Sequence, residues 1–156
     1  MNIELKTCTG EIFRIIKEWE QKLMSLPEEV ISQKINNQNR NIRQILGHLI
    51  DSASNNHQRI IRLQYNECLE FSDYRQDNDL WIALQDYQHT NWNNLIQLWK
   101  YYNLHIIQII EAVDKSKFTN YWFDFEKTKV TLYEMIIGYP EHLKLHMNEI
   151  NELLNK

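Results

Sequence analysis

Apolar side chains recur every three or four residues in four stretches of this chain, which is the spacing of one buried face of an α-helix. The first stretch follows Thr9 and Gly10 and should end near Leu26, because a proline at position 27 disfavours a helical conformation in the residue before it. The other three are expected from Asn41 to about Gln64, from Trp92 to Val113 and from Thr131 to Leu153. The pattern therefore predicts four long amphipathic helices.

Two of these helices carry a recognisable start signal. Asn41 followed by Gln44, and Thr131 followed by Glu134, have the spacing of a capping box, in which two side chains bind backbone amides at a helix N-terminus. The segments between the helices are less regular. We predict a polar connector over residues 33–40, a long loop with one helical turn near Trp81 over 65–88, and an aromatic stretch with one short hairpin over 118–130.

The composition favours a single helical domain over residues 1–156. The chain has only three glycines and two prolines, too few for the turns of a sandwich or barrel with many short strands. Four amphipathic helices, two of them joined by long connections, indicate an all-α four-helix bundle. Such bundles place their ligand and metal sites between facing helices.

Charge and hydropathy exclude several classes of partner. A net charge of −4 gives no basic field for a phosphate backbone, which argues against binding to nucleic acid. No apolar run approaches the roughly 18 to 20 residues of a membrane-spanning helix, and the N-terminus lacks the apolar region of a secretion signal. Cys8 and Cys68 form no disulfide or metal-binding pattern. We therefore expect a cytoplasmic protein that binds neither nucleic acid nor membrane.

Three of the six histidines stand out by their positions. His142 and His146 lie one turn apart on the last predicted helix, so their Cβ atoms should be roughly 5 to 6 Å apart, which suits two ligands of one metal ion. His48 stands among apolar residues of the second helix, where a third imidazole would complete the three-ligand pattern of catalytic zinc sites. From these residues alone, a solvated histidine pair and a core histidine bonded to a backbone carbonyl remain open alternatives.

Two longer segments that contain these histidines resemble a known family. They are GHLIDSASNNHQRIIRLQ at 47–64 and GYPEHLKLHMNEI at 138–150, and with LWIALQDYQ and LWKYYNLH between them they are similar to the DinB/YfiT-like superfamily of metalloenzymes. The similarity covers most of the chain from about Asn41 onward. It implies a four-helix bundle with one metal ion, held by one histidine of the second helix and two of the last, which correspond here to His48, His142 and His146.

The chain departs from the pattern of this family at two places. Arg40 and Asn41 stand where members often have a Trp-Ser pair, although Asn41 can still cap the helix. Pro140 lies two residues before His142, and a proline inside a helix removes one hydrogen bond and clashes with the carbonyl four residues earlier, at a cost of about 3 kcal/mol. We therefore expect a kink or break between Gly138 and Pro140 that bears on the affinity for metal.

Four further residues are expected near the histidines. Ser52 and Asn55 share the face of the second-helix histidine and would line the mouth of the site or orient a water molecule, or else are ordinary polar positions at a bundle end. Asp51 would hold a ligand ring by a hydrogen bond, or else form a surface salt bridge. Gly138 would leave space above the metal, or else allow close packing beside the proline.

The predicted ligand set points to a reaction class. Three neutral imidazoles leave the charge of a divalent ion uncompensated, so a bound water would be acidified towards a pKa of about 7. We expect a metal-dependent enzyme that acts on a small molecule, either a hydrolase or, as in some members of the superfamily, a transferase that uses a low-molecular-weight thiol. The alternatives are a bundle that binds metal or a small ligand without turnover, and a purely structural bundle. Zinc is the expected metal, although nickel, copper, iron and manganese also accept histidine ligands.

The aromatic content bears on assembly. The chain has five tryptophans, and we expect that a bundle of this size cannot bury them all. An exposed apolar patch of the kind that homodimers use is therefore predicted from some of them. The five are Trp19, Trp81, Trp92, Trp99 and Trp122.

Overall fold

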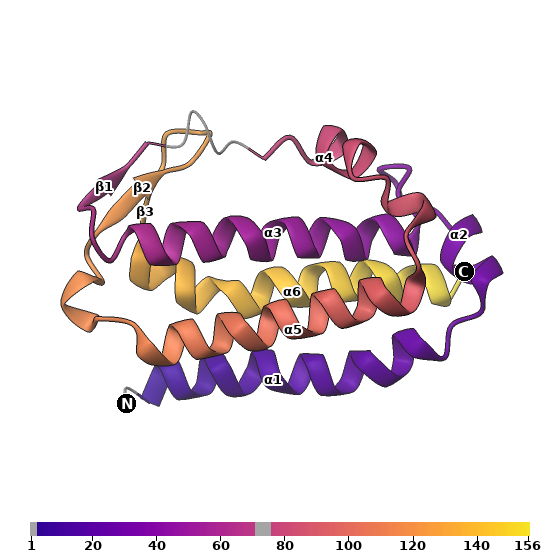
Figure 1. Ribbon diagram of the computed structural model, residues 1–156, viewed down its shortest axis with the longest axis horizontal. Helices are drawn as coiled ribbons and strands as arrows, with labels where there is room; N and C mark the ends of the chain where they lie inside the picture. The colour runs from indigo at the N-terminus through magenta and orange to yellow at the C-terminus, as the bar shows by residue number, and fades with distance from the viewer. Residues whose placement is uncertain (1–2, 71–75) are drawn as a thin grey trace.

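Four long helices form the body of the protein in a computed structural model that describes residues 3–70 and 76–156. They are α1 (Ile3–Met24), α3 (Ile42–Arg62), α5 (Trp92–Ala112) and α6 (Leu132–Leu154). Helix α3 packs on α5 and α6, and α1 packs on the same two helices from the other side, which closes the bundle. Figure 1 shows that α3 and α5 run in one direction, and α1 and α6 in the opposite direction.

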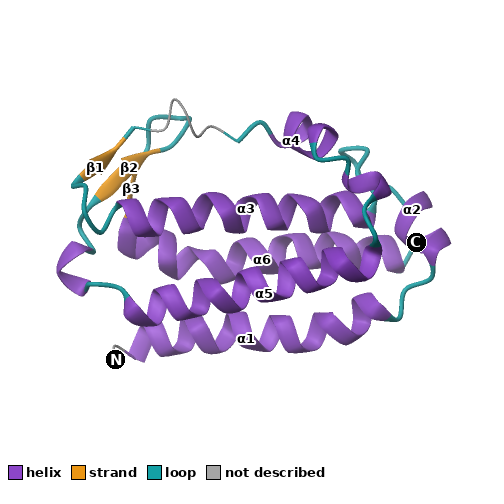
Figure 2. Cartoon of the chain, viewed as in Figure 1, coloured by secondary structure: helices purple, strands orange, loops and turns teal. Residues whose placement is uncertain are grey.

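The shorter elements lie in the connections between these helices. The chain passes from α3 to α5 by a crossover along the outside of α3, and a small sheet stands at one end of it (Figure 2). In this sheet the central strand pairs in parallel with the first and antiparallel with the third. The short elements are the helices α2 (Glu28–Gln33) and α4 (Asn78–Leu84), the 3₁₀ turns η2 (Tyr87–His89) and η3 (Lys115–Lys117), and the strands β1 (Cys68–Leu69), β2 (Tyr121–Phe123) and β3 (Lys129–Thr131).

The fold confirms the predicted four-helix bundle, both capping boxes and the short hairpin. Asn41 and Gln44 bind each other's backbone amides at the start of α3, and Thr131 and Glu134 do the same at the start of α6. The predicted start of the first helix after Gly10 is wrong, because α1 already begins at Ile3. Neither α2 nor the parallel strand β1 was predicted from the sequence. Within the described ranges, no helix is long and apolar enough to cross a membrane.

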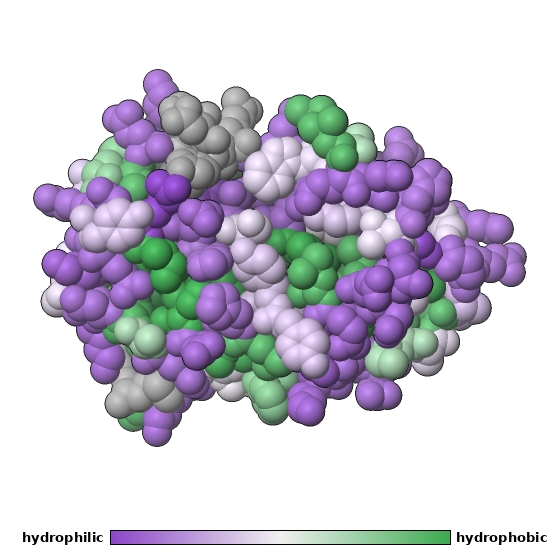
Figure 3. Space-filling view, in the orientation of Figure 1, coloured by the Kyte–Doolittle hydropathy of each residue, from purple (hydrophilic) through white to green (hydrophobic). Residues whose placement is uncertain are grey.

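The core runs along the whole bundle and contains only part of the tryptophan set. Trp19 and Trp99 are buried and the other three are partly buried, which confirms that the bundle does not bury all five, whereas an interaction patch made of tryptophans stays a prediction. Those three lie on α4, at the start of α5 and on β2, outside the middle of the bundle. Figure 3 shows hydrophobic side chains gathered in a band over the middle of one face, within a mostly hydrophilic surface. The homodimer stays a prediction.

Pro140 does not break α6, so the break, one of the two outcomes expected from the sequence, does not occur. The helix is continuous from Leu132 to Leu154 with the proline inside it. Proline has no amide to donate to the carbonyl of Ile136, and the Cys8 thiol from α1 donates to that carbonyl instead, with Sγ and the oxygen 3.2 Å apart. Burial raises the pKa of Cys8 to about 11, which keeps this thiol protonated and able to donate. A hydrogen bond from another helix thus satisfies the Ile136 carbonyl, which the proline leaves without a donor within α6.

Replacing this thiol should destabilise the bundle. In Cys8→Ala the Ile136 carbonyl becomes a buried acceptor without a partner, and we expect the free energy of unfolding to fall by about 1 to 3 kcal/mol. Urea denaturation measures the loss. The matched control is the same substitution in a Pro140→Ala background, where the amide of residue 140 can donate to that carbonyl. An equal loss in both backgrounds would show that only the packing of the thiol matters.

Candidate metal centre

Three histidines come together between α3 and α6. His48 lies on α3, His142 and His146 lie on α6, and one nitrogen of each lies within 4.8 Å of the others. The Nε2 atoms of His48 and His146 are 3.1 Å apart. The ring centroid of His142 lies 4.7 Å from that of His146 and 5.9 Å from that of His48. The fold thus gathers the three residues that the sequence pattern singled out.

The two helices that carry the histidines are fixed by the core on either side of them. Leu49 on α3 and Leu143 and Met147 on α6 adjoin the histidines in sequence, and all three belong to the buried core. The capping boxes fix where each helix begins, and therefore which residues face each other along the pair. His48 and His146 are themselves buried. Rigid helices on both sides give the site more precise geometry than loops would.

The environment of the site keeps two of the imidazoles neutral. Burial, together with charge repulsion from His146, His142 and Arg40, lowers the pKa of His48 to about 3. Burial, together with repulsion from His146 and Arg59, lowers the pKa of His142 to about 4. A metal ion binds the neutral form of imidazole. These two rings are therefore available as ligands well below neutral pH.

Two residues that the sequence analysis did not single out contact the outer sides of the rings. Glu149 Oε2 lies 3.1 Å from Nδ1 of His146, one turn along α6. Gln76 Nε2 lies 3.3 Å from Nδ1 of His48. Glu149 can accept a hydrogen bond from Nδ1–H of His146, which leaves Nε2 of that ring without a proton. The amide Nε2 of Gln76 can only donate to Nδ1 of His48, which places the proton of that ring on Nε2, so this proton has to leave Nε2 before the atom can bind a metal ion. The spacing of Glu149 from His146 was a usable sequence signal, whereas Gln76 reaches His48 from the crossover, which no local pattern indicates.

The four predicted neighbours of the histidines divide into three groups. Ser52 and Gly138 line the cavity over the site, and a methyl group added at Gly138 would meet nothing within 4 Å. Asn55 acts indirectly, because its Nδ2 donates to Oε1 of Gln76 at 2.7 Å. Asp51 does not hold a ligand ring, which corrects that expectation.

The carboxylate of Asp51 instead anchors the crossover to α3. It accepts hydrogen bonds from the Tyr87 hydroxyl at 2.7 Å and from Gln85 Nε2 at 2.6 Å. The aromatic ring of Tyr87 lies directly over Gly47, where a Cβ atom would come within 2.2 Å of it. Asp51 and Gly47 thus allow the segment with Gln85 and Tyr87 to pack on α3, next to His48.

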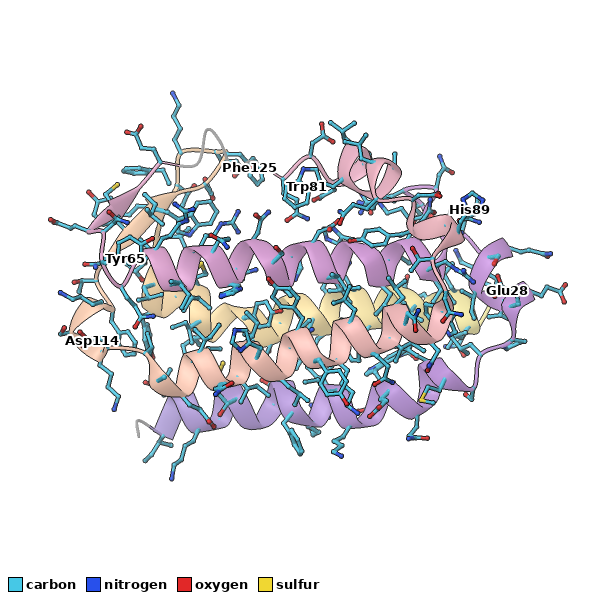
Figure 4. All side chains as sticks on the ribbon, in the orientation of Figure 1. Glu28, Tyr65, Trp81, His89, Asp114 and Phe125 are labelled. Atoms are coloured by element: carbon cyan, nitrogen blue, oxygen red, sulfur yellow. The ribbon has the colours of Figure 1, made fainter. Side chains whose placement is uncertain are left out.

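The remaining histidines lie apart from this cluster. His57 faces α5, where its Nδ1 lies 3.2 Å from the Tyr102 hydroxyl and its ring centroid lies 5.2 Å from that of His105. His89 is at the surface beside Asp86. Figure 4 shows His89 near the α2 end of the bundle. Among the described residues, groups of three or more potential ligands occur at the triad of His48, His142 and His146 alone.

The three rings fit a metal ion in both geometry and chemistry. Two ligand nitrogens on one tetrahedral zinc ion, each about 2.1 Å from the metal, lie roughly 3.4 Å apart, close to the separation of the facing nitrogens of His48 and His146. The Nδ1 atom of His142 is buried and has no hydrogen-bond partner within the described part of the chain. Glu149 can accept a hydrogen bond from Nδ1–H of His146, which leaves Nε2 free as a ligand.

A cavity of about 960 Å³ opens over the histidines. Its floor is formed by α3 and α6, and its outer wall includes the hairpin of β2 and β3. Figure 4 places Phe125 from the hairpin and Trp81 from α4 on the same side of α3. The walls combine the imidazoles with aromatic and small side chains, among them Ser52, Trp122, Phe123, Phe125, Gly138 and Tyr139. The site can therefore admit a small organic molecule.

The bundle has a counterpart among solved structures. YfiT from Bacillus subtilis superposes on 98% of this chain and 87% of its own, with a TM-score of 0.84 and 16% sequence identity. The chain has the YfiT fold. YfiT is described as a probable metal-dependent hydrolase with an unusual four-helix bundle topology. Neither a protein-family model nor a curated protein matches the sequence. The likeness to YfiT shows the fold alone.

Removing the carboxylate beside His146 should weaken metal binding. In Glu149→Gln the acceptor for the Nδ1 proton loses its charge, and we expect the affinity for zinc to fall about 10- to 100-fold. Competition with a chromophoric chelator measures the change. Glu152→Gln is the matched control, because Glu152 is an exposed residue of the same helix. An equal affinity in both variants would contradict a role for Glu149 at the centre.

Proposed function

We propose that this chain is a metal-dependent hydrolase of a small organic molecule, with its divalent ion held by His48, His142 and His146. The observation that carries this proposal is the approach of three ring nitrogens to within 4.8 Å in the floor of an open cavity. The shared fold with YfiT, described as a probable metal-dependent hydrolase, supports the same conclusion. Zinc is the proposed metal, because it accepts three histidines and keeps a fourth position open.

The residues of the chain would bind the metal ion, orient its histidine ligands and shield the site from bulk water. When bound, the ion would lower the pKa of a coordinated water or thiol and so supply a nucleophile at neutral pH. Glu149 would hold the Nδ1 proton of His146, and Gln76, itself bound by Asn55, would hold the ring of His48. The aromatic wall of the hairpin would limit the access of bulk water, which strengthens electrostatic interactions within the site.

Metal content is the first test of this proposal. The protein should be prepared without a histidine tag, loaded with zinc, dialysed and analysed for metal per chain. We expect about one equivalent in the wild type and a loss of at least tenfold in affinity for His142→Ala, because one of three ligands is lost. His89→Ala is the control, since His89 is exposed and remote from the triad. Equal, near-zero metal in all three proteins would refute the proposal.

Activity assays then separate the reaction classes. A panel of ester, amide and phosphoester substrates tests for hydrolysis, and conjugation of a low-molecular-weight thiol to an electrophile tests for transfer. Hydrolysis that requires zinc and is lost in His142→Ala supports the proposal. Thiol conjugation alone would reassign the centre to a transferase. Zinc binding without either activity would instead favour a non-catalytic binding bundle.

A further inference from the structure

A second pair of histidines lies between α3 and α5. His57 belongs to α3 and follows His48 by nine residues, so at about 100° per residue it projects to the opposite side of that helix. His105 belongs to α5. Neither of the two lines the cavity over the triad in the part of the chain that the structure describes. The pair is therefore separate from the candidate metal centre.

The two rings are spaced as two ligands of one metal ion are. The centroid of a coordinated imidazole lies roughly 3.2 Å from the metal, so ligand angles of about 90 to 110° separate two such centroids by roughly 4.5 to 5.3 Å. The centroids of His57 and His105 are 5.2 Å apart, with the ring planes at 89° to each other. For comparison, the centroids of His48 and His146 in the triad are 4.6 Å apart. The separation in the second pair thus fits a shared ion.

A tyrosine of α5 orients the ring of His57. The hydroxyl oxygen of Tyr102 lies 3.2 Å from Nδ1 of His57, and the two rings form a T-shaped contact with centroids 5.9 Å apart. The hydroxyl oxygen can accept a hydrogen bond from Nδ1–H, which leaves Nε2 with a free lone pair for a metal ion. Tyr102 therefore acts on His57 as Glu149 acts on His146 in the triad.

The pair is accessible to an ion from solution. His105 is exposed and His57 is partly buried, so an ion between them keeps an open side towards water. Burial, together with charge repulsion from His105, lowers the pKa of His57, which favours the neutral ring at pH 7. Neutral imidazole is the form that binds a metal ion.

The backbone on both sides of the pair is fixed by the core. Helices α3 and α5 pack against each other, and Ile60 and Ile106, which lie next to the two histidines along their helices, belong to the buried core. Rigid helices hold two ligands at a set distance before the ion arrives. Less conformational entropy is then lost on binding than with histidines on loops.

We propose that His57 and His105 form a second metal site, which binds one divalent late transition-metal ion and binds copper(II) most tightly. Imidazole suits copper, nickel and zinc, and copper(II) has the highest affinity in the general order of divalent ions. Two protein ligands leave the other coordination positions to water or to a donor group of a small molecule. The proposal does not rest on the metal centre of the triad, because the two sites share no residue.

Copper binding to a variant without the triad tests this proposal. The background is His48→Gln/His142→Gln, prepared without a histidine tag, and isothermal titration calorimetry with Cu²⁺ measures affinity and stoichiometry. Pulsed electron paramagnetic resonance of the complex counts the coordinated imidazoles through their remote nitrogens. We expect about one ion per chain with two imidazole ligands. Adding His105→Gln should weaken copper binding about tenfold or more, because one of the two ligands is lost.

The matched control adds His89→Gln to the same background. His89 is an exposed histidine that pairs with Asp86, and its replacement should leave the copper affinity unchanged. Equal affinity with and without His105, or a single coordinated imidazole, would overturn the proposal. If the background variant does not fold, the comparison is made in the wild type. There His105→Gln, at an exposed position, should lower the copper bound by about one ion per chain, and an unchanged stoichiometry would overturn the proposal.

Discussion

Acid should destabilise the metal-free protein by roughly 2 to 4 kcal/mol between pH 7 and pH 5. Histidines of the unfolded chain take up protons near pH 6.5, whereas folded His48 does so only near pH 3 and folded His142 near pH 4. Between these values the unfolded state binds more protons. Each histidine therefore lowers the free energy of unfolding by up to about 1.4 kcal/mol for each unit by which the pH falls.

Urea denaturation in the presence of a chelator measures this dependence across the pH range. The double variant His48→Gln/His142→Gln should have a flatter profile than the wild type, because the two histidines whose folded-state pKa values fall to about 3 and about 4 are gone. His89→Gln, which alters an exposed histidine, is the control and should keep the wild-type profile. Parallel profiles for the wild type and the double variant would contradict the assignment of the acid sensitivity to the triad.

Two glycines inside long helices should respond in opposite ways to the same substitution. At Gly47 an added Cβ atom would lie 2.2 Å from the ring of Tyr87, whose hydroxyl is bound to Asp51. The ring cannot move away without breaking that bond, so Gly47→Ala should lower the free energy of unfolding by about 2 to 4 kcal/mol. Gly138→Ala meets open space and should raise it by about 0.5 to 1 kcal/mol, because alanine favours the helix.

Urea denaturation of both variants at neutral pH tests this contrast. The clash at position 47 can be isolated by repeating Gly47→Ala in a Tyr87→Ala background, where the substitution should cost little. The displaced crossover should also weaken zinc binding, because Gly47 adjoins His48. Stabilisation by both alanines would mean that the ring of Tyr87 does not pack on α3 as described.

The helices could be predicted from the sequence because their signals are local, whereas the three clustered histidines were singled out by the spacing of His142 and His146 and by a resemblance to a known family. Apolar periodicity marked each long helix, and the capping boxes at Asn41 and Thr131 placed two starts correctly. The early start of α1 was missed because Gly10 resembles a boundary. Leu5 and Cys8 are buried, so packing of the first two turns against the bundle outweighs the helix cost of glycine.

The missed features depend on contacts between residues far apart in the chain. Strand β1 has two residues, and it pairs with Tyr121 and Trp122, which lie more than fifty positions later. The hydrogen bond of Gln76 to His48 and the anchoring of Asp51 by Tyr87 likewise have no signature in spacing or composition. The expected break at Pro140 followed from the local rule that a proline inside a helix removes one backbone hydrogen bond. It does not occur, because the thiol of Cys8 satisfies the exposed carbonyl.

The hairpin of β2 and β3 lines the cavity, whereas other elements of the fold supply the histidines. It supplies aromatic wall to the cavity and none of the three histidines, which all come from α3 and α6. Changes in its length or side chains can therefore alter what the cavity accepts while the helical scaffold keeps the imidazoles in place. Variation confined to the hairpin would thus be a route by which the same bundle could evolve to accept a different molecule.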